Sequence, residues 1–256
     1  MREGSVLRVL LTVSYDGTNY CGSQIQENGN TIEEELNKAL SSIYKAPVKT
    51  DGASRTDSGV HAKGNLFVYD IEDENAFVAE KVSYALNSRL PSDIRVIDSR
   101  QVPPDFHPRY QNSEKTYVYR ILNTEFDDPL RTRFTYHYHR GLDTALMNEA
   151  ASYLVGEHDF SSFASEKATV SSFVRTLFSC SVTRDEDEIV IMVRGNGFLY
   201  NMVRIIAGTL VEVGAKKYAP SYVGEILMKK SRSFAGPTAP AKGLTLLKIE
   251  LKGAEQ

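Results

Sequence analysis

Cysteine and long apolar runs are scarce in this sequence, and each scarcity excludes a class of protein. Its 256 residues include two cysteines, Cys21 and Cys180, and neither has another Cys or a His nearby at metal-site spacing. We therefore expect two reduced thiols in a cytoplasmic protein, not a disulfide scaffold. No segment approaches the roughly 18 apolar residues that a membrane-spanning helix needs, and no low-complexity stretch or long Gly/Ser linker is present.

The remaining composition is typical of a soluble globular protein, with 41% hydrophobic and 25% charged residues. The apolar run at residues 6–17 is interrupted by Arg8 and is not followed by a small-residue cleavage site. It predicts a first strand and not a signal peptide.

Charge is unevenly distributed along the chain. The net charge is −3, yet residues 189–256 contain ten Lys and Arg against four Glu, a net of +6 that leaves −9 for the rest. Such a chain can present one basic surface to a polyanion while its total stays acidic. The alternative is that Lys216, Lys217, Lys229 and Lys230 only solvate helix surfaces.

Hydrophobic periodicity predicts two similar α+β halves, residues 1–104 and 105–256, separated near Pro103 and Pro104. The expected strands are 6–17, 65–72, 94–102, 115–122, 173–184, 188–195 and 244–251, and the expected helices are 31–44, 76–90, 143–155, 199–215 and 220–230. We expect the halves to join into one mostly antiparallel sheet with helices on one face. A central cleft is expected between them, because ligand sites favour such junctions.

A glycine-rich loop, G-A-S-R-T-D-S-G-V-H-A-K-G at residues 52–64, follows the first expected helix. Its glycines admit positive φ angles and let the chain turn sharply around Asp57. In most loops Asp and Ser hydrogen-bond the local backbone, which is the simplest interpretation of R-T-D-S-G alone.

Two functional interpretations of this loop have little support. A metal site on Asp57 and His61 would lack any further cluster of ligands. An aspartic protease needs two carboxylates that share a proton, but no second D-S-G or D-T-G occurs, so such an enzyme would have to be a symmetric dimer. Arg55 and Thr56 also stand where a protease strand would be apolar.

Taken whole, the loop resembles the signature G-A-G-R-T-D-A-G-V-H-A of the bacterial tRNA pseudouridine synthase A family, with Ser54 and Ser58 as departures. The resemblance continues in order over nearly the whole chain. The further motifs are Y-D-G-T-N-Y-C-G-S-Q-I-Q, F-H-P-R-Y-Q-N-S-E-K-T-Y-V-Y-R-I, G-E-H-D-F-S-S-F, G-N-G-F-L-Y-N-M-V-R and P-T-A-P-A-K-G-L-T-L. In the first of them, Ser23 stands where a Trp is common in the family.

The resemblance implies an enzyme that isomerises uridine to pseudouridine in the anticodon stem-loop of tRNA, at positions 38, 39 and 40. It implies a homodimer that binds tRNA in the central cleft and uses no cofactor and no metal. The essential residue would be Asp57, acting as nucleophile or base beside Arg204, while Arg55 would help to flip the nucleotide out. The predicted substrate-binding residues are Tyr117, Leu244, His61 and Lys115.

Two alternatives stay open at this point. Arg204 also fits a solvated helix face, because it shares a polar stripe with residues at helical spacing, Tyr200, Asn201, Gly208 and Glu212. The chain is also compatible with a non-catalytic RNA-binding module of the same fold. The intact set of Arg55, Asp57, Tyr117 and Arg204 favours the enzyme.

Overall fold

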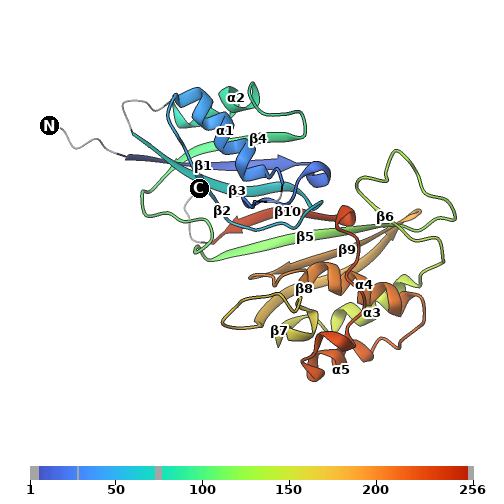
Figure 1. The fold of residues 1–256 in the computed structure, drawn as a ribbon. Coiled ribbons are helices and arrows are strands. Elements are labelled where there is room, and N and C mark those ends of the chain that lie inside the picture. Colours follow the sequence, from blue (N-terminus) through green and yellow to red (C-terminus); the bar gives the residue numbers. More distant parts are fainter. Residues whose placement is uncertain (1–5, 28, 73–76, 253–256) are drawn as a thin grey trace. The chain divides into compact units, whose positions relative to one another are not determined.

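The computed structural model describes residues 6–27, 29–72 and 77–252, and its fold class is α+β with mostly antiparallel strand pairs (Figure 1). Internal contacts divide the chain into two compact units. Unit 1 comprises Met1–Asn112 together with Leu246–Gln256, and unit 2 comprises Ser113–Thr245. In the described parts of the chain, no helix combines the length and apolar character required to cross a membrane.

Unit 1 is a sheet with two helices. Its strands are β1 (Val6–Tyr15), β2 (Thr50–Gly52), β3 (His61–Glu72), β4 (Ile94–Val102) and most of β10 (Leu244–Leu251). Strand β1 runs antiparallel to both β3 and β4, and β3 also pairs with β2 and neighbours β10. The helices are α1 (Ile32–Tyr44) and α2 (Val82–Asn87), with short 3-10 turns η1 (Gly17–Asn19) and η3 (Ala79–Lys81).

The core of unit 1 follows from two periodicities in the sequence. Alternate residues of β1, Val9, Leu11 and Val13, are fully buried, as expected for one face of a strand. In α1 the buried residues recur at helical spacing, at Ile32, Leu36 and Leu40. Figure 1 shows α1 and α2 lying over the sheet, so these two faces supply the core.

The segment after β4 belongs to unit 1, which moves the division from the expected residue 104 to residue 112. Arg8 donates a hydrogen bond to the Phe106 carbonyl at 2.8 Å, and Arg109 donates one to the Gly52 carbonyl at 3.0 Å. Asn112, the last residue of this segment, accepts a hydrogen bond at its carbonyl from the Lys252 amide at 2.7 Å.

Within unit 2 the strand order is β6-β5-β9-β8-β7. The strands are β5 (Ser113–Leu122), β6 (Tyr136–His137), β7 (Gly156–Asp159), β8 (Val174–Asp185) and β9 (Glu188–Gly195). Strands β5 and β6 run parallel, and the other pairs run antiparallel. The helices are α3 (Thr144–Ser152), α4 (Met202–Gly214) and α5 (Tyr222–Lys229), with 3-10 turns η4 (Ser161–Phe163), η5 (Arg232–Phe234) and η6 (Ala241–Gly243).

Candidate active site

The glycine-rich loop between β2 and β3 is a compact turn fastened by backbone hydrogen bonds. The Ala53 amide donates to the Leu66 carbonyl at 2.8 Å, and the Val60 amide donates to the Asp57 carbonyl at 3.1 Å. Gly59 has a φ of +78°, a conformation that glycine adopts without steric cost. A side chain at Gly17, on the preceding turn, would collide with the Val60 carbonyl.

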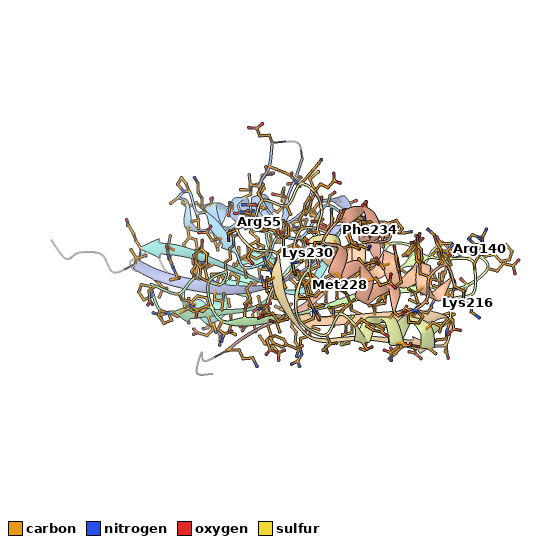
Figure 2. The ribbon with its side chains drawn as sticks, turned by 90° about the horizontal axis from the view of Figure 1, so that it is seen from below. Arg55, Arg140, Lys216, Met228, Lys230 and Phe234 are labelled. Atoms are coloured by element: carbon orange, nitrogen blue, oxygen red, sulfur yellow. The ribbon has the colours of Figure 1, made fainter. Side chains whose placement is uncertain are left out.

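This turn presents its two charged residues differently. Arg55 is exposed to solvent (Figure 2), whereas Asp57 is half-buried. Their neighbours Ser54 and Thr56 are each 7% exposed. The backbone around Arg55 is therefore buried while its guanidinium group reaches outward.

His61 is fixed at the start of β3 and is 3% exposed. Its Nδ1 atom accepts a hydrogen bond from the Gly17 amide at 3.1 Å and lies 3.2 Å from Asp16 Oδ1. The ring thus anchors the end of the loop to the turn after β1. Its role in binding substrate stays a prediction.

A buried polar network beneath the loop was not anticipated from the sequence. The Tyr15 hydroxyl lies 2.7 Å from Thr56 Oγ1. Asn65 Nδ2 donates to the Ser54 carbonyl at 2.9 Å and to the Tyr15 hydroxyl at 3.2 Å. Burial raises the pKa of Tyr15 to about 12, so its hydroxyl stays protonated at neutral pH. The signal that the sequence offered was Asn65, a polar residue directly before the apolar run at residues 66–69.

In unit 2, Arg204 is held at the beginning of α4, not in the middle of the longer helix that the sequence predicted. Its Nε donates to the Ala239 carbonyl at 2.8 Å and its Nη1 donates to Asn201 Oδ1 at 2.9 Å. Asn201 has a left-handed backbone with φ of +62°, which starts the helix at Met202. Glu212, a member of the expected polar stripe, forms an ion pair with Lys217 at 2.7 Å.

Strand β5 carries the two predicted substrate-binding residues of that segment. Tyr117 is 5% exposed, and its ring packs edge-on against Phe198 with centroids 4.9 Å apart. Lys115 lies opposite Gly195 in the ladder with β9. Both side chains belong to the same face of the strand, since successive residues alternate.

The segment at residues 239–244 joins these parts of unit 2. The Ala239 carbonyl accepts the hydrogen bond from the Arg204 guanidinium, and the Ala239 amide donates one to the Arg204 carbonyl at 3.1 Å. The next residue, Pro240, accepts a hydrogen bond from the Tyr119 hydroxyl at 2.8 Å. Leu244 follows η6 and is 5% exposed. Of the predicted residues, Arg204 therefore contacts the first residue of this segment, and Leu244 is its last residue.

Part of the basic excess of unit 2 lies at helix ends. Lys216 and Lys217 follow α4, and Lys229 and Lys230 end α5, positions at which positive charge stabilises the helix dipole. Figure 2 shows Lys230 at α5, and Arg140 and Lys216 at one end of unit 2. All four lysines are exposed.

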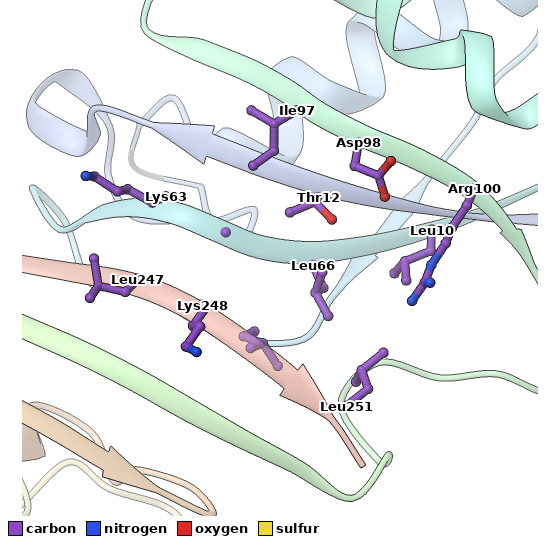
Figure 3. A pocket seen from close by; sticks show the side chains of 12 residues that line it. Leu10, Thr12, Lys63, Leu66, Ile97, Asp98, Arg100, Leu247, Lys248 and Leu251 are labelled. Atoms are coloured by element: carbon purple, nitrogen blue, oxygen red, sulfur yellow. The ribbon is translucent and has the colours of Figure 1, made fainter. Parts of the chain in front are cut away.

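A hollow of about 410 Å³ lies on the sheet of unit 1, and none of the predicted site residues lines it (Figure 3). It is formed by alternate residues of β1, β3, β4 and β10, among them Leu10, Leu66, Ile97 and Leu251. Charged side chains at its edge are Lys63, Asp98, Arg100 and Lys248. Within the described residues, no group of three or more His, Cys, Asp and Glu is placed to hold a metal ion.

Comparisons with known proteins identify one family. The sequence model described as "tRNA pseudouridine synthase" matches residues 11–111 and 150–251. The chain is 45% identical to the tRNA pseudouridine synthase A of Halalkalibacterium halodurans, over 93% of this chain and 90% of that protein. It is equally identical to those of Clostridium acetobutylicum and Thermoanaerobacter sp. (strain X514), in each case over 94% of this chain and 98% of the relative.

Proposed function

The chain belongs to the tRNA pseudouridine synthase family, and from this we propose that it converts uridine into pseudouridine at positions 38, 39 and 40 of the tRNA anticodon stem-loop. The observation that carries the proposal is the rigid turn at residues 53–60, which holds Asp57 half-buried next to the exposed Arg55. The reaction detaches uracil at its nitrogen from the ribose, rotates the base and rejoins it through carbon. Substrate and product are isomers, so no group is added or lost.

We assign the essential role to Asp57, as nucleophile at the anomeric carbon or as base. Either role requires an ionised carboxylate, which burial alone would disfavour by raising its pKa. We assign Arg204 as its counter-charge. At a separation of about 4 Å and an effective dielectric of about 20, such an attraction is on the order of 4 kcal/mol.

The other roles follow from exposure and shape. Arg55, exposed on a fixed backbone, is proposed to displace the target nucleotide from its stack. Tyr117, braced by Phe198, is proposed to pack against the extruded uracil. His61, Lys115 and Leu244 complete the proposed substrate-binding set.

We further propose that tRNA is held mainly through its phosphates, which gives a salt-dependent affinity. Lys229, at the end of α5, and Arg140 are candidates because both are exposed. Lys216, Lys217 and Lys230 are weaker candidates, because each already pairs with a carboxylate, at 3.7, 2.7 and 3.3 Å. Arg131 is a weaker candidate, because it makes a bidentate ion pair with Asp187 at 2.9 and 2.6 Å and another contact with Asp128 at 2.9 Å. Its charge is already balanced.

We also propose that the protein is a cytoplasmic homodimer. The location agrees with a tRNA substrate and with cysteines that form no disulfide, Cys21 and Cys180. A second copy is the proposed occupant of the hollow on unit 1. An interface around a two-fold axis must complement itself, and a surface that carries both lysines and an aspartate around an apolar floor can do so.

The test is tritium release from tRNA labelled at uracil C5. We expect wild-type protein to release tritium, and Asp57→Ala and Asp57→Asn to release none while still binding tRNA in a filter assay. Robust turnover by Asp57→Ala would overturn the assignment. Binding without release by the wild type would instead indicate a non-catalytic RNA-binding module.

A further inference from the structure

Ser23 makes three hydrogen bonds to the backbone on either side of Arg55. Its hydroxyl accepts a hydrogen bond from the Thr56 amide at 2.8 Å and donates one to the Ser54 carbonyl at 3.4 Å. Its own amide donates to the Thr56 carbonyl at 3.1 Å. Ser23 is 3% exposed, so water does not compete for these bonds.

The other side of Ser23 is fixed to the first turn of α1. The Ser23 carbonyl accepts from the Glu33 amide at 3.0 Å, and the Gly22 carbonyl accepts from the Ile32 amide at 3.3 Å. Gly22 has a φ of +97°, and a side chain there would come within 2.7 Å of the Thr56 carbonyl oxygen. Ser23 therefore connects the first turn of α1 to the loop through hydrogen bonds.

The polar network of Tyr15, Asn65 and Thr56 supports the same backbone from beneath. Together with Ser23, it provides partners for the Ser54 carbonyl and for the Thr56 amide, carbonyl and hydroxyl. A buried amide without an acceptor would be costly. Ser23 thus holds both the amide and the carbonyl of Thr56, the residue that leads into Asp57.

We propose that Ser23 is a positioning residue, which holds the Thr56 backbone at its amide and its carbonyl so that the Asp57 carboxylate keeps its reactive orientation. This inference rests on the proposed function of Asp57. It is particular to serine: the Thr56 amide requires an acceptor, and the Trp that is common here in the family has only an indole N–H donor. The side-chain clamp therefore depends on the serine at this position.

The test compares Ser23→Ala with Ser41→Ala. The Ser41 hydroxyl, on α1, accepts a hydrogen bond from the Val48 amide at 3.0 Å, so both changes remove the acceptor of one backbone amide. We expect comparable decreases in Tm. We expect kcat for pseudouridine formation to fall about 10- to 100-fold in Ser23→Ala alone, with KM for tRNA little changed, because small displacements of reacting groups cost rates of this order.

Two further variants complete the design. Ser23→Thr keeps the hydroxyl and should recover most of kcat. Ser23→Cys is close in size but a weaker acceptor, so it should give an intermediate kcat, and it replaces the alanine variant if that protein does not fold. A wild-type kcat in Ser23→Ala or Ser23→Cys, or an equal loss in Ser41→Ala, would overturn the proposal.

Hydrogen exchange of the Thr56 amide separates this inference from the proposed function. Faster exchange is expected in Ser23→Ala than in Ser41→Ala, whether or not the protein is an enzyme. If the wild type forms no pseudouridine, the proposed function fails; unchanged exchange at Thr56 refutes the clamp itself.

Discussion

Arg204 donates hydrogen bonds to two oxygen atoms, the Ala239 carbonyl and Asn201 Oδ1. A guanidinium group can serve both at once because its donors form a planar fork, whereas a lysine ammonium is a single point charge on a flexible stem. The fixed orientation suits a residue proposed to supply the counter-charge for Asp57.

Two replacements of Arg204 distinguish the effect of its positive charge from the effect of its fixed orientation: leucine removes both, and lysine keeps only the charge. We expect Arg204→Leu to be nearly inactive in tritium release and Arg204→Lys to retain partial activity. Arg204→Leu should also lower the free energy of unfolding by about 1–3 kcal/mol, because a part-buried carbonyl loses its donor. Urea titration and release assays measure the two effects.

Arg232→Leu is the matched control. Arg232 donates to the Ala235 carbonyl at 3.1 Å and to Thr238 Oγ1 at 3.3 Å, so the change also removes a guanidinium from the segment before Ala239. We expect a similar loss of stability with activity retained. Full activity of Arg204→Leu would show that the assigned pairing is wrong.

The sequence could indicate Arg204 and Asp57 but not what holds them. Helical spacing placed Arg204 in one stripe with Asn201 and Glu212, and Asn201 does accept a hydrogen bond from it. Glu212 pairs with Lys217 instead, and the other acceptor of Arg204, the Ala239 carbonyl, is 35 residues away. No local pattern encodes a contact of that separation. The hydrogen bonds from Ser23 to the Asp57 loop were not predictable either, since the sequence showed Ser23 only as a departure from the family motif.

At the scale of elements, long amphipathic segments were predictable and short strands were not. The expected strands at 94–102, 188–195 and 244–251 have the observed bounds of β4, β9 and β10. Strands β2, β6 and β7 contain two to four residues, too few to show an alternating pattern. The helix expected at 76–90 is observed as η3 and α2 over Ala79–Asn87, and Ala76 lies outside the described residues.

The start of α1 is a suitable test of an element. Thr31 Oγ1 accepts a hydrogen bond from the Glu34 amide at 3.3 Å, which satisfies one donor of the first turn. We expect Thr31→Ala to lower the free energy of unfolding by about 1 kcal/mol, measured by urea denaturation. Ser42→Ala, later in the same helix, should leave stability unchanged or slightly raised because of the helix propensity of alanine. Equal effects of the two changes would contradict the assigned cap.

At the scale of the whole molecule, the chain does not divide into units at a single point. Its closing strand β10 lies next to β3, and Leu246–Gln256 belong to unit 1 although they follow unit 2 in sequence. The sequence predicted this strand with its correct ends, but assigned it to the second half. Hydrophobic periodicity identifies a strand and does not name its neighbour.

Strand β10 also contributes residues to the hollow on unit 1. This hollow is the proposed interface of the homodimer, and a substitution there tests it. Ile97 lines the hollow and is 58% exposed, so burial against a second copy would stabilise the pair by the hydrophobic effect. A stable interface buries about 800 Å² on each partner, and a charge at its apolar part should prevent association. We expect wild-type protein to sediment as a dimer and Ile97→Asp as a folded monomer. Val78→Asp, at another exposed apolar residue of unit 1 (60%), should remain dimeric, whereas a dimeric Ile97→Asp would exclude this face as the interface.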